Sequence, residues 1–568
     1  MSHWSKLAAA IALVACEATP PPKGPPIGMS HGPIAPPPEA ALVPASVTAL
    51  AAGAMIFGDL GTLHRPVSAS AEAQAYFDQG LRLTYGFNHD EAARSFARGA
   101  ELDPRCAMCF WGAALVLGPN YNVPMLPDRA KAAWESLERA RALAPSMTPV
   151  ERALILALAK RYKGPEPLDP AAMAPHSAAY ADAMRDVAKQ FPDDNDLQVL
   201  FAESMMDLSP WKLWKLDGKP EKGTEEIVST LETVLGRAKD HPGANHYYIH
   251  VMEPSPNPEK AVDAAERLPS LMPGAGHIVH MPAHIFQRVG RYADASAANS
   301  KAVEVDLAYL RKTKAPGYYP MYLGHNFGFL AFSASMEGRR ADSLAAARQS
   351  AKAIPPSMTD MMPGMDFLVA EPILAMVRFG RWDELLAEPR PEAKYQVLTG
   401  FWLHGHGMAL AAKGRYAEAE ADLAELTKLR NSAPAELMAG NNQAKDVFGV
   451  AAKVLEARLA TLQNKKDALA LWADATAQAD RLAYAEPDDW FYPVRHFQGA
   501  ALLTAGKAKD AEMVYREDLR RHPHNGWALY GLWQSVAKQK RPAEAKALEA
   551  EYELAWQKAD FKLTTTAF

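Results

Sequence analysis

The sequence predicts an all-α protein built from stacked helical hairpins, and three observations lead to this fold class. Apolar residues recur at helical spacing from residue 70 to the C-terminus, without sustained strand alternation. Similar two-helix blocks return along the chain, among them "GRYADASAANSKAVEVD" and "GRYAEAEADLAELTKL". The composition, with 49% hydrophobic and 22% charged residues, is that of an ordinary soluble globular protein.

The blocks share a register that two positions define. A small residue recurs at one place, and a proline follows twelve residues later: Ala92 with Pro104, Ala261 with Pro273, and Ala511 with Pro523. This pattern resembles the tetratricopeptide repeat, a 34-residue helix–turn–helix unit. The resemblance implies an α-α superhelical solenoid over residues 67–568, with a concave groove that takes a peptide or a protein partner.

The N-terminus is typical of a targeting segment. A lysine precedes the short apolar run "LAAAIALVA", which is too short to span a bilayer. Leu13–Cys16 resembles the lipobox of bacterial lipoproteins; an ordinary signal peptide is the alternative. The resemblance implies a signal peptide over residues 1–16, a lipid on Cys16 and a lipid-anchored place in the bacterial cell envelope. By the same resemblance, Glu17 favours the outer membrane.

Residues 17–66 are expected to form a Pro-rich tether and a leader to the array, because a segment such as "TPPPKGPPIG" favours extended backbone over a packed core. The net charge of −5 and the absence of a basic run interleaved with aromatics argue against a nucleic-acid partner.

Histidines gather in two stretches, "NHYYIHVME" and "GHIVHMPAHIF". In the repeat family, positions 2, 5, 9 and 12 of the first helix face the groove. These positions hold His246, His250 and Glu253 in one repeat, His277, His280 and His284 in the next, and His325 in the one after. With 17 histidines in 568 residues, about one would fall on such positions by chance, whereas eight do so once His404 and His496 are included. Histidines at i and i+4 share one helix face, so we expect the two stretches to form one site on adjacent helices.

Such a cluster is typical of a transition-metal site, because neutral imidazole is the commonest side-chain ligand of these metals. Glu253 is a further ligand or an outer acceptor. The protease motif H-E-x-x-H is absent. Copper is favoured over zinc and iron because thioethers follow in "SMTDMMPGM": Met358, Met361, Met362 and Met365. These methionines are also explained by ordinary packing.

Three functions stay open at this point. The first is an envelope protein that binds copper or another transition metal in its groove. The second is a metal-dependent oxidoreductase, with three histidines on each of two metals as in coupled dinuclear copper oxidases. The third is a metal-free scaffold that binds a peptide or protein.

Several further residues carry weaker predictions. His404, His496, Glu203 and Asp207 are expected to form a secondary polar region of the groove, although Glu203 and Asp207 could also face solvent. Cys106 and Cys109 form a lone C-x-x-C that predicts a disulfide, a redox dithiol or a soft metal pair. His89, His241 and His522 are expected in solvated turns.

Overall fold

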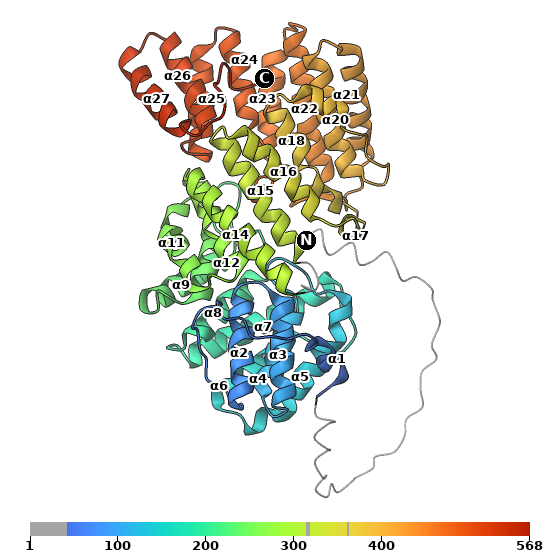
Figure 1. Ribbon diagram of the computed structural model, residues 1–568, viewed down its shortest axis with the longest axis vertical. Helices are drawn as coiled ribbons and strands as arrows, with labels where there is room; N and C mark the ends of the chain where they lie inside the picture. The colour runs from blue at the N-terminus through green and yellow to red at the C-terminus, as the bar shows by residue number, and fades with distance from the viewer. Residues whose placement is uncertain (1–42, 314–318, 361–362) are drawn as a thin grey trace, which may run out of the picture. The chain divides into compact units, whose positions relative to one another are not determined.

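The computed structural model describes residues 43–313, 319–360 and 363–568, and it divides them into two compact units (Figure 1). The N-terminal unit holds residues 43–56, 63–84 and 89–210, and the C-terminal unit holds residues 57–62, 85–88 and 211–568. The signal peptide, Cys16, residues 17–42 of the tether, Met361 and Met362 lie outside the described residues.

All regular secondary structure in the described residues of the N-terminal unit is helical. It contains α1 (Ala45–Leu50), α2 (Ala71–Tyr85), α3 (His89–Leu102), α4 (Ala107–Leu117), η4 (Pro127–Arg129), α5 (Ala130–Leu143), η5 (Ala144–Ser146), α6 (Pro149–Leu158), α7 (Pro170–Gln190) and α8 (Asn195–Met206). The last residue of α2, Tyr85, belongs with the C-terminal unit. Successive helices pack as neighbours, as α3 does on α4 and α7 on α8.

The C-terminal unit begins with α9 (Thr224–Arg237), α10 (Pro242–Met252), η6 (Pro258–Ala261), α11 (Val262–Leu271), α12 (Gly276–His280), α13 (Pro282–Arg288), α14 (Tyr292–Lys312), α15 (Pro320–Met336), α16 (Arg340–Ala353), α17 (Pro356–Thr359) and η7 (Met365–Val369). It continues with α18 (Glu371–Arg378), α19 (Trp382–Ala387), α20 (Gln396–Ala412), α21 (Tyr416–Ser432), α22 (Ala444–Leu462), α23 (Ala468–Ala479), α24 (Val494–Thr504), α25 (Ala508–Arg521), α26 (Gly526–Lys538) and α27 (Pro542–Ala555). A two-residue antiparallel ribbon, β1 (Met438–Ala439) and β2 (Asn442–Gln443), precedes α22.

Helix pairs that follow one another along the chain lie side by side, as α15 and α16 or α26 and α27 do in Figure 1. Small residues on the first helix of a pair permit this close approach. A Cβ on Gly80 would lie 2.6 Å from the ring of Phe96, and a Cβ on Gly499 would lie 2.3 Å from the ring of Tyr515. The small-residue position of the repeat therefore has a steric cause.

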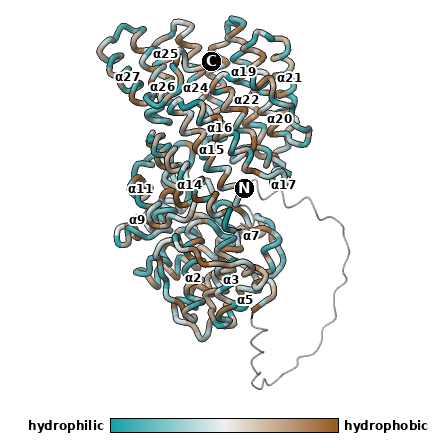
Figure 2. Tube along the Cα trace, in the orientation of Figure 1, coloured by the Kyte–Doolittle hydropathy of each residue, from teal (hydrophilic) through white to brown (hydrophobic). Residues whose placement is uncertain are grey.

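The prediction of an all-α array of helical hairpins is confirmed. Figure 2 shows hydrophobic and hydrophilic residues interleaved along the helices, as expected where each helix buries one face. Large apolar side chains such as Phe401, Phe448 and Trp472 are buried in the core of the C-terminal unit. Among the described residues, no helix is both long enough and apolar enough to cross a membrane.

Candidate metal centre

The first histidine pair lies on α10. His241 caps this helix, since its Nδ1 accepts a hydrogen bond of 3.1 Å from a backbone N–H three residues later. Pro242 occupies the first helical position, where a missing N–H breaks no hydrogen bond. His246 and His250 are one turn apart on the same face, and Glu253 follows at the end of the helix.

The second histidine stretch forms α12 and α13, which Met281 separates. A glycine is required at the start of α12, because a Cβ on Gly276 would lie 1.7 Å from Oδ1 of Asp306. The repeat register predicts one helix across this stretch, but the helix is broken at Met281, because Pro282 has no N–H to continue the hydrogen-bond ladder. His277 and His280 lie on α12, and His284 lies on α13.

The six histidines form two groups of three in the C-terminal unit. Triad A contains His246, His250 and His277, and triad B contains His280, His284 and His325. In each triad, one candidate ligand atom from each residue lies within 4.8 Å of the other two. Each triad takes two histidines one turn apart and a third from a later helix of the array, so the repeat register generates the same arrangement twice.

The shapes of the triads agree closely. The ring-centroid distances are 4.9, 5.0 and 6.1 Å in triad A, and 4.7, 4.8 and 5.8 Å in triad B. The Nε2 atoms of His246 and His277 are 3.2 Å apart, and those of His280 and His284 are 2.8 Å apart. A metal about 2.0 Å from each of three nitrogens separates them by about 3.4 Å, which is close to these two distances and lies within the 4.8 Å limit for all ligand atoms of either triad.

Outer hydrogen bonds fix the tautomers of two rings. Nδ1 of His246 lies 2.5 Å from the carbonyl oxygen of Tyr85, which can only accept, so this Nδ1 donates. Nδ1 of His280 lies 2.6 Å from Oδ1 of Asn299, whose amide group donates to a backbone carbonyl. Both rings therefore direct the lone pair of Nε2 toward the other histidines of their triads, as metal-bound imidazoles do.

Glu253 contacts one histidine of each triad. Its Oε1 lies 3.3 Å from Nδ1 of His250, and its Oε2 forms an ion pair with Nδ1 of His284. Oε2 of Glu486, from the loop between α23 and α24, lies 3.4 Å from the same Nδ1. Glu253, His284 and Glu486 thus form a third group that could hold a cation, although this group shares its histidine with triad B.

Burial and neighbouring charges separate the pKa values of these groups. Burial lowers the pKa of His277 and His280 well below the ordinary value, and the surrounding histidines lower it further. Burial also lowers the pKa of His325, to about 3. Burial opposes the charged form of His284, but Glu253 outweighs it and raises the pKa of His284 to about 9.

The two carboxyl groups diverge in the same way. Burial would raise the pKa of Glu253, but His284 and His250 outweigh burial and lower it to about 2. Burial and the charge of Glu253 raise the pKa of Glu486 to about 8. A single ionised carboxylate therefore serves the site, and most of the imidazoles are held neutral, the form that binds a metal.

The two triads lie next to one another. The ring centroids of His250 and His284 are 5.6 Å apart, and those of His277 and His280 are 5.8 Å apart. Five of the six rings are fully buried, while His325 is partly exposed.

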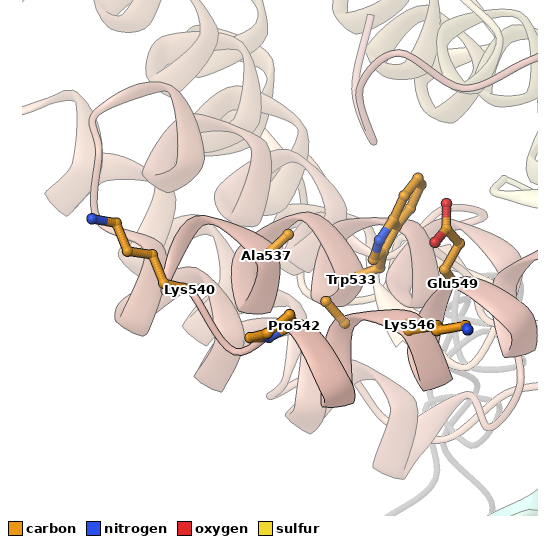
Figure 3. Close-up of a pocket in the computed structure, with 7 residues that line it drawn as sticks. Trp533, Ala537, Lys540, Pro542, Lys546 and Glu549 are labelled. Atoms are coloured by element: carbon orange, nitrogen blue, oxygen red, sulfur yellow. The ribbon is translucent and has the colours of Figure 1, made fainter.

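A separate surface hollow of about 400 Å³ lies between α26 and α27, lined by Trp533 and Lys546 among others (Figure 3), and it contains no histidine.

Two predicted groove histidines do not join this centre. His404 is fully buried. Its Nδ1 is hydrogen-bonded to the carbonyl oxygen of Ala451 at 2.9 Å, and its Nε2 is hydrogen-bonded to the hydroxyl of Tyr492 at 2.7 Å. His496 is fully buried against Asp518, with Nε2 at 2.8 Å from a carboxylate oxygen. The expectation of a shared polar groove was wrong for both, because each ring is bonded to a partner inside the core.

Glu203 and Asp207 also lie elsewhere. They belong to the N-terminal unit, where Arg161 donates to Asp207 at 2.7 Å and all three side chains are buried. They do not face solvent. Burial raises the pKa of Glu203. Burial and the neighbouring Glu203 together raise the pKa of Asp207.

Other predictions have mixed outcomes. Cys106 and Cys109 are joined by a disulfide at the start of α4. His89 and His241 are buried, so the expectation of solvated turns was wrong for them. His522 is partly exposed and lies 3.3 Å from Asp488.

Sequence reasoning missed four side chains of the site. Asn299 and Phe329 lie on α14 and α15, and Phe87 and Glu486 lie in loops. Asn299 lies on the second helix of its repeat, and no spacing pattern links the two loops to the histidines. The groove positions 2, 5, 9 and 12 of the first helices include none of the four, because Phe329 lies between two such positions of α15.

Comparisons with known proteins leave the chain without an assigned family. No protein-family model and no curated protein sequence matches it. Solved structures with similarity include the human IFIT1 dimer with m7Gppp-AAAA, at 13% identity, 87% coverage of this chain, 96% of that chain and a TM-score of 0.35. The P58(IPK) TPR domain has 14% identity, 83% and 99% coverage, and a TM-score of 0.21. At these TM-scores the likeness supports no inference about function. Fold and site together define an all-α helical-repeat protein with two convergent histidine triads.

Proposed function

We propose that this protein binds two transition-metal ions, one in triad A and one in triad B, with copper favoured over zinc and iron. The observation that carries the proposal is the duplication: two sets of three imidazoles, buried except for His325, have nearly the same shape, and both bring ring nitrogens together. A chance cluster of histidines would not repeat this geometry with the register of the array. The lipid-anchored envelope location predicted from Cys16 is part of the same proposal.

The residues present suit such an ion. Imidazole nitrogens bind copper, zinc, nickel and iron, and outer acceptors such as Tyr85 O and Asn299 hold the rings in the ligating tautomer. Each triad would supply three imidazole donors, with His284 losing its proton when the metal binds. Met358 is buried and Met365 is partly buried. The preference for copper stays the prediction made from the methionines of the sequence, since imidazole by itself does not distinguish copper from zinc or iron.

Reconstitution with each metal, followed by removal of unbound ions and elemental analysis, tests the proposal. The expected result is about two equivalents of copper per chain. Less than about 0.2 equivalents of any of the three metals would contradict it. If the metal-free chain then bound a peptide or protein equally well with and without chelator, the protein would instead be a scaffold.

A second function, oxidation chemistry at paired metal ions, is favoured by the adjacency of the triads. The ring centroids of His250 in triad A and His284 in triad B are 5.6 Å apart, so ions in the two triads would lie close to one another. Bound copper would supply one-electron chemistry and a site for dioxygen. Oxygen consumption with phenolic or peptide substrates, lost in His280→Ala, would support an oxidase; inertness across a broad panel would contradict it.

A further inference from the structure

Each triad is covered by one phenylalanine ring. Phe329, on α15, lies 4.7, 4.5 and 4.7 Å from the ring centroids of His280, His284 and His325. Because it is nearly equidistant from all three, its ring lies over the middle of triad B. From this position the phenyl ring would keep water from one side of a metal held by the three imidazoles.

Phe87 covers triad A from a different part of the chain. Its ring centroid lies 4.5, 5.5 and 5.7 Å from those of His246, His250 and His277. Phe87 adopts a φ of +55°, and Trp211, whose ring centroid is 6.0 Å from that of His250, adopts +60°. A bulky side chain at positive φ costs about 1–2 kcal/mol, and such strain is found at functional sites more often than elsewhere.

We infer that Phe87 and Phe329 set the metal preference of the centre, by keeping water from one face of each triad and so favouring Cu(I) over Zn²⁺. This inference rests on the proposed metal-binding function and adds the identity and oxidation state of the ion. The two residues act through the environment of the metal, since a phenyl ring offers no donor atom.

The physical reason lies in coordination and charge. Zinc sites with three protein ligands complete their coordination with water, whereas Cu(I) is stable with three nitrogens alone. Imidazoles bring no negative charge, and the cost of placing an ion in an apolar interior rises steeply with its charge. A dry ligand set, in which the single carboxylate of Glu253 is shared between two ions, therefore penalises a divalent ion more than a monovalent one.

Near-isosteric variants isolate the role of polarity. Phe329→Leu and Phe329→Asn both shorten the side chain, but only the asparagine brings a group that can hold a water beside the metal. Phe87→Leu and Phe87→Asn repeat the comparison at triad A, where asparagine also tolerates the positive φ. Circular dichroism melts confirm folding before any titration, and any variant that unfolds is replaced by its counterpart at the other triad.

Competition titrations with a Cu(I) chelator and a Zn²⁺ chelator then give the affinity ratio of the two ions. We expect wild type and the leucine variants to prefer Cu(I), with X-ray absorption showing three nitrogens and no oxygen. We expect the asparagine variants to lose at least about tenfold of that preference relative to leucine. Equal ratios for leucine and asparagine, or a fourth light ligand on Cu(I) in wild type, would overturn the inference. No binding of either ion to wild type would instead overturn the proposed function.

Discussion

Replacing Glu253 by glutamine tests whether one carboxylate organises both triads. The carboxylate contacts Nδ1 of His250 through Oε1 and Nδ1 of His284 through Oε2. A glutamine has one carbonyl oxygen and one amide group, so it can accept from only one of these N–H groups. The other ring then meets a donor, and the tautomer that presents its second nitrogen to the triad is lost.

The expected effect follows from this geometry. Loss of an outer partner of a metal-binding histidine weakens affinity by about 10–100-fold, or about 1.4–2.7 kcal/mol. The pKa of Glu253 is lowered from 4.5 to about 2 by the two histidines, which corresponds to about 3 kcal/mol of folded-state stability at neutral pH. Since the folded-state pKa is depressed, this contribution is full above pH 4.5 and is lost as the pH falls toward 2.

The assay is a pair of measurements on Glu253→Gln and on a matched control. Glu232→Gln removes an exposed carboxylate of α9 that accepts a hydrogen bond of 2.8 Å from Tyr248. We expect chelator competition to show weakened binding at both triads, and urea unfolding of the metal-free protein to show a loss of stability, only in Glu253→Gln. Unchanged affinity at both triads would refute the reasoning, and weakening at one triad alone would limit Glu253 to that set.

Three further predictions use matched variants. His280→Ala should reduce bound copper from about two equivalents to about one, whereas His404→Ala should leave two, as elemental analysis would show; equal losses would contradict the separate roles of these rings. In urea unfolding, Gly276→Ala should destabilise the protein by at least about 2 kcal/mol, because the new Cβ would clash with Asp306. The control Gly236→Ala should change the stability by no more than about 1 kcal/mol, because nothing lies within 4 Å of a Cβ at that position. Burial lowers the pKa of His404 from 6.5 to about 4, so the contribution of His404 to the free energy of unfolding is full above pH 6.5 and is lost as the pH falls toward 4. Between pH 7 and pH 5, wild type should therefore lose about 2 kcal/mol more stability than His404→Gln. Parallel pH profiles of stability for the two proteins would refute this.

Helical periodicity and the repeat register were sufficient to predict the array, because each hairpin buries its faces against its neighbours in the same way. The same register placed His246, His250, His277, His280, His284 and His325 together, since residues at equivalent positions of consecutive first helices point to one side. That part of the site is a property of local spacing, which the sequence displays directly.

The rest depended on contacts between distant segments. Glu486 reaches His284 from a loop about 200 residues further along the chain, and Phe87 reaches triad A from the loop after α2. His404 occupies a groove-type position, yet its nitrogens are bonded to Ala451 and Tyr492 inside the core. Repeat position predicts the side of a helix that a residue occupies, and the packing partners decide whether the residue lines a site or fills a core.

The most direct test of the central claim is anomalous diffraction at the copper edge from crystals of the copper-loaded protein. Two peaks are expected, one inside each set of three imidazoles, with both peaks bonded to ring nitrogens. A single peak among Glu253, His284 and Glu486, or peaks only at surface positions, would contradict the account.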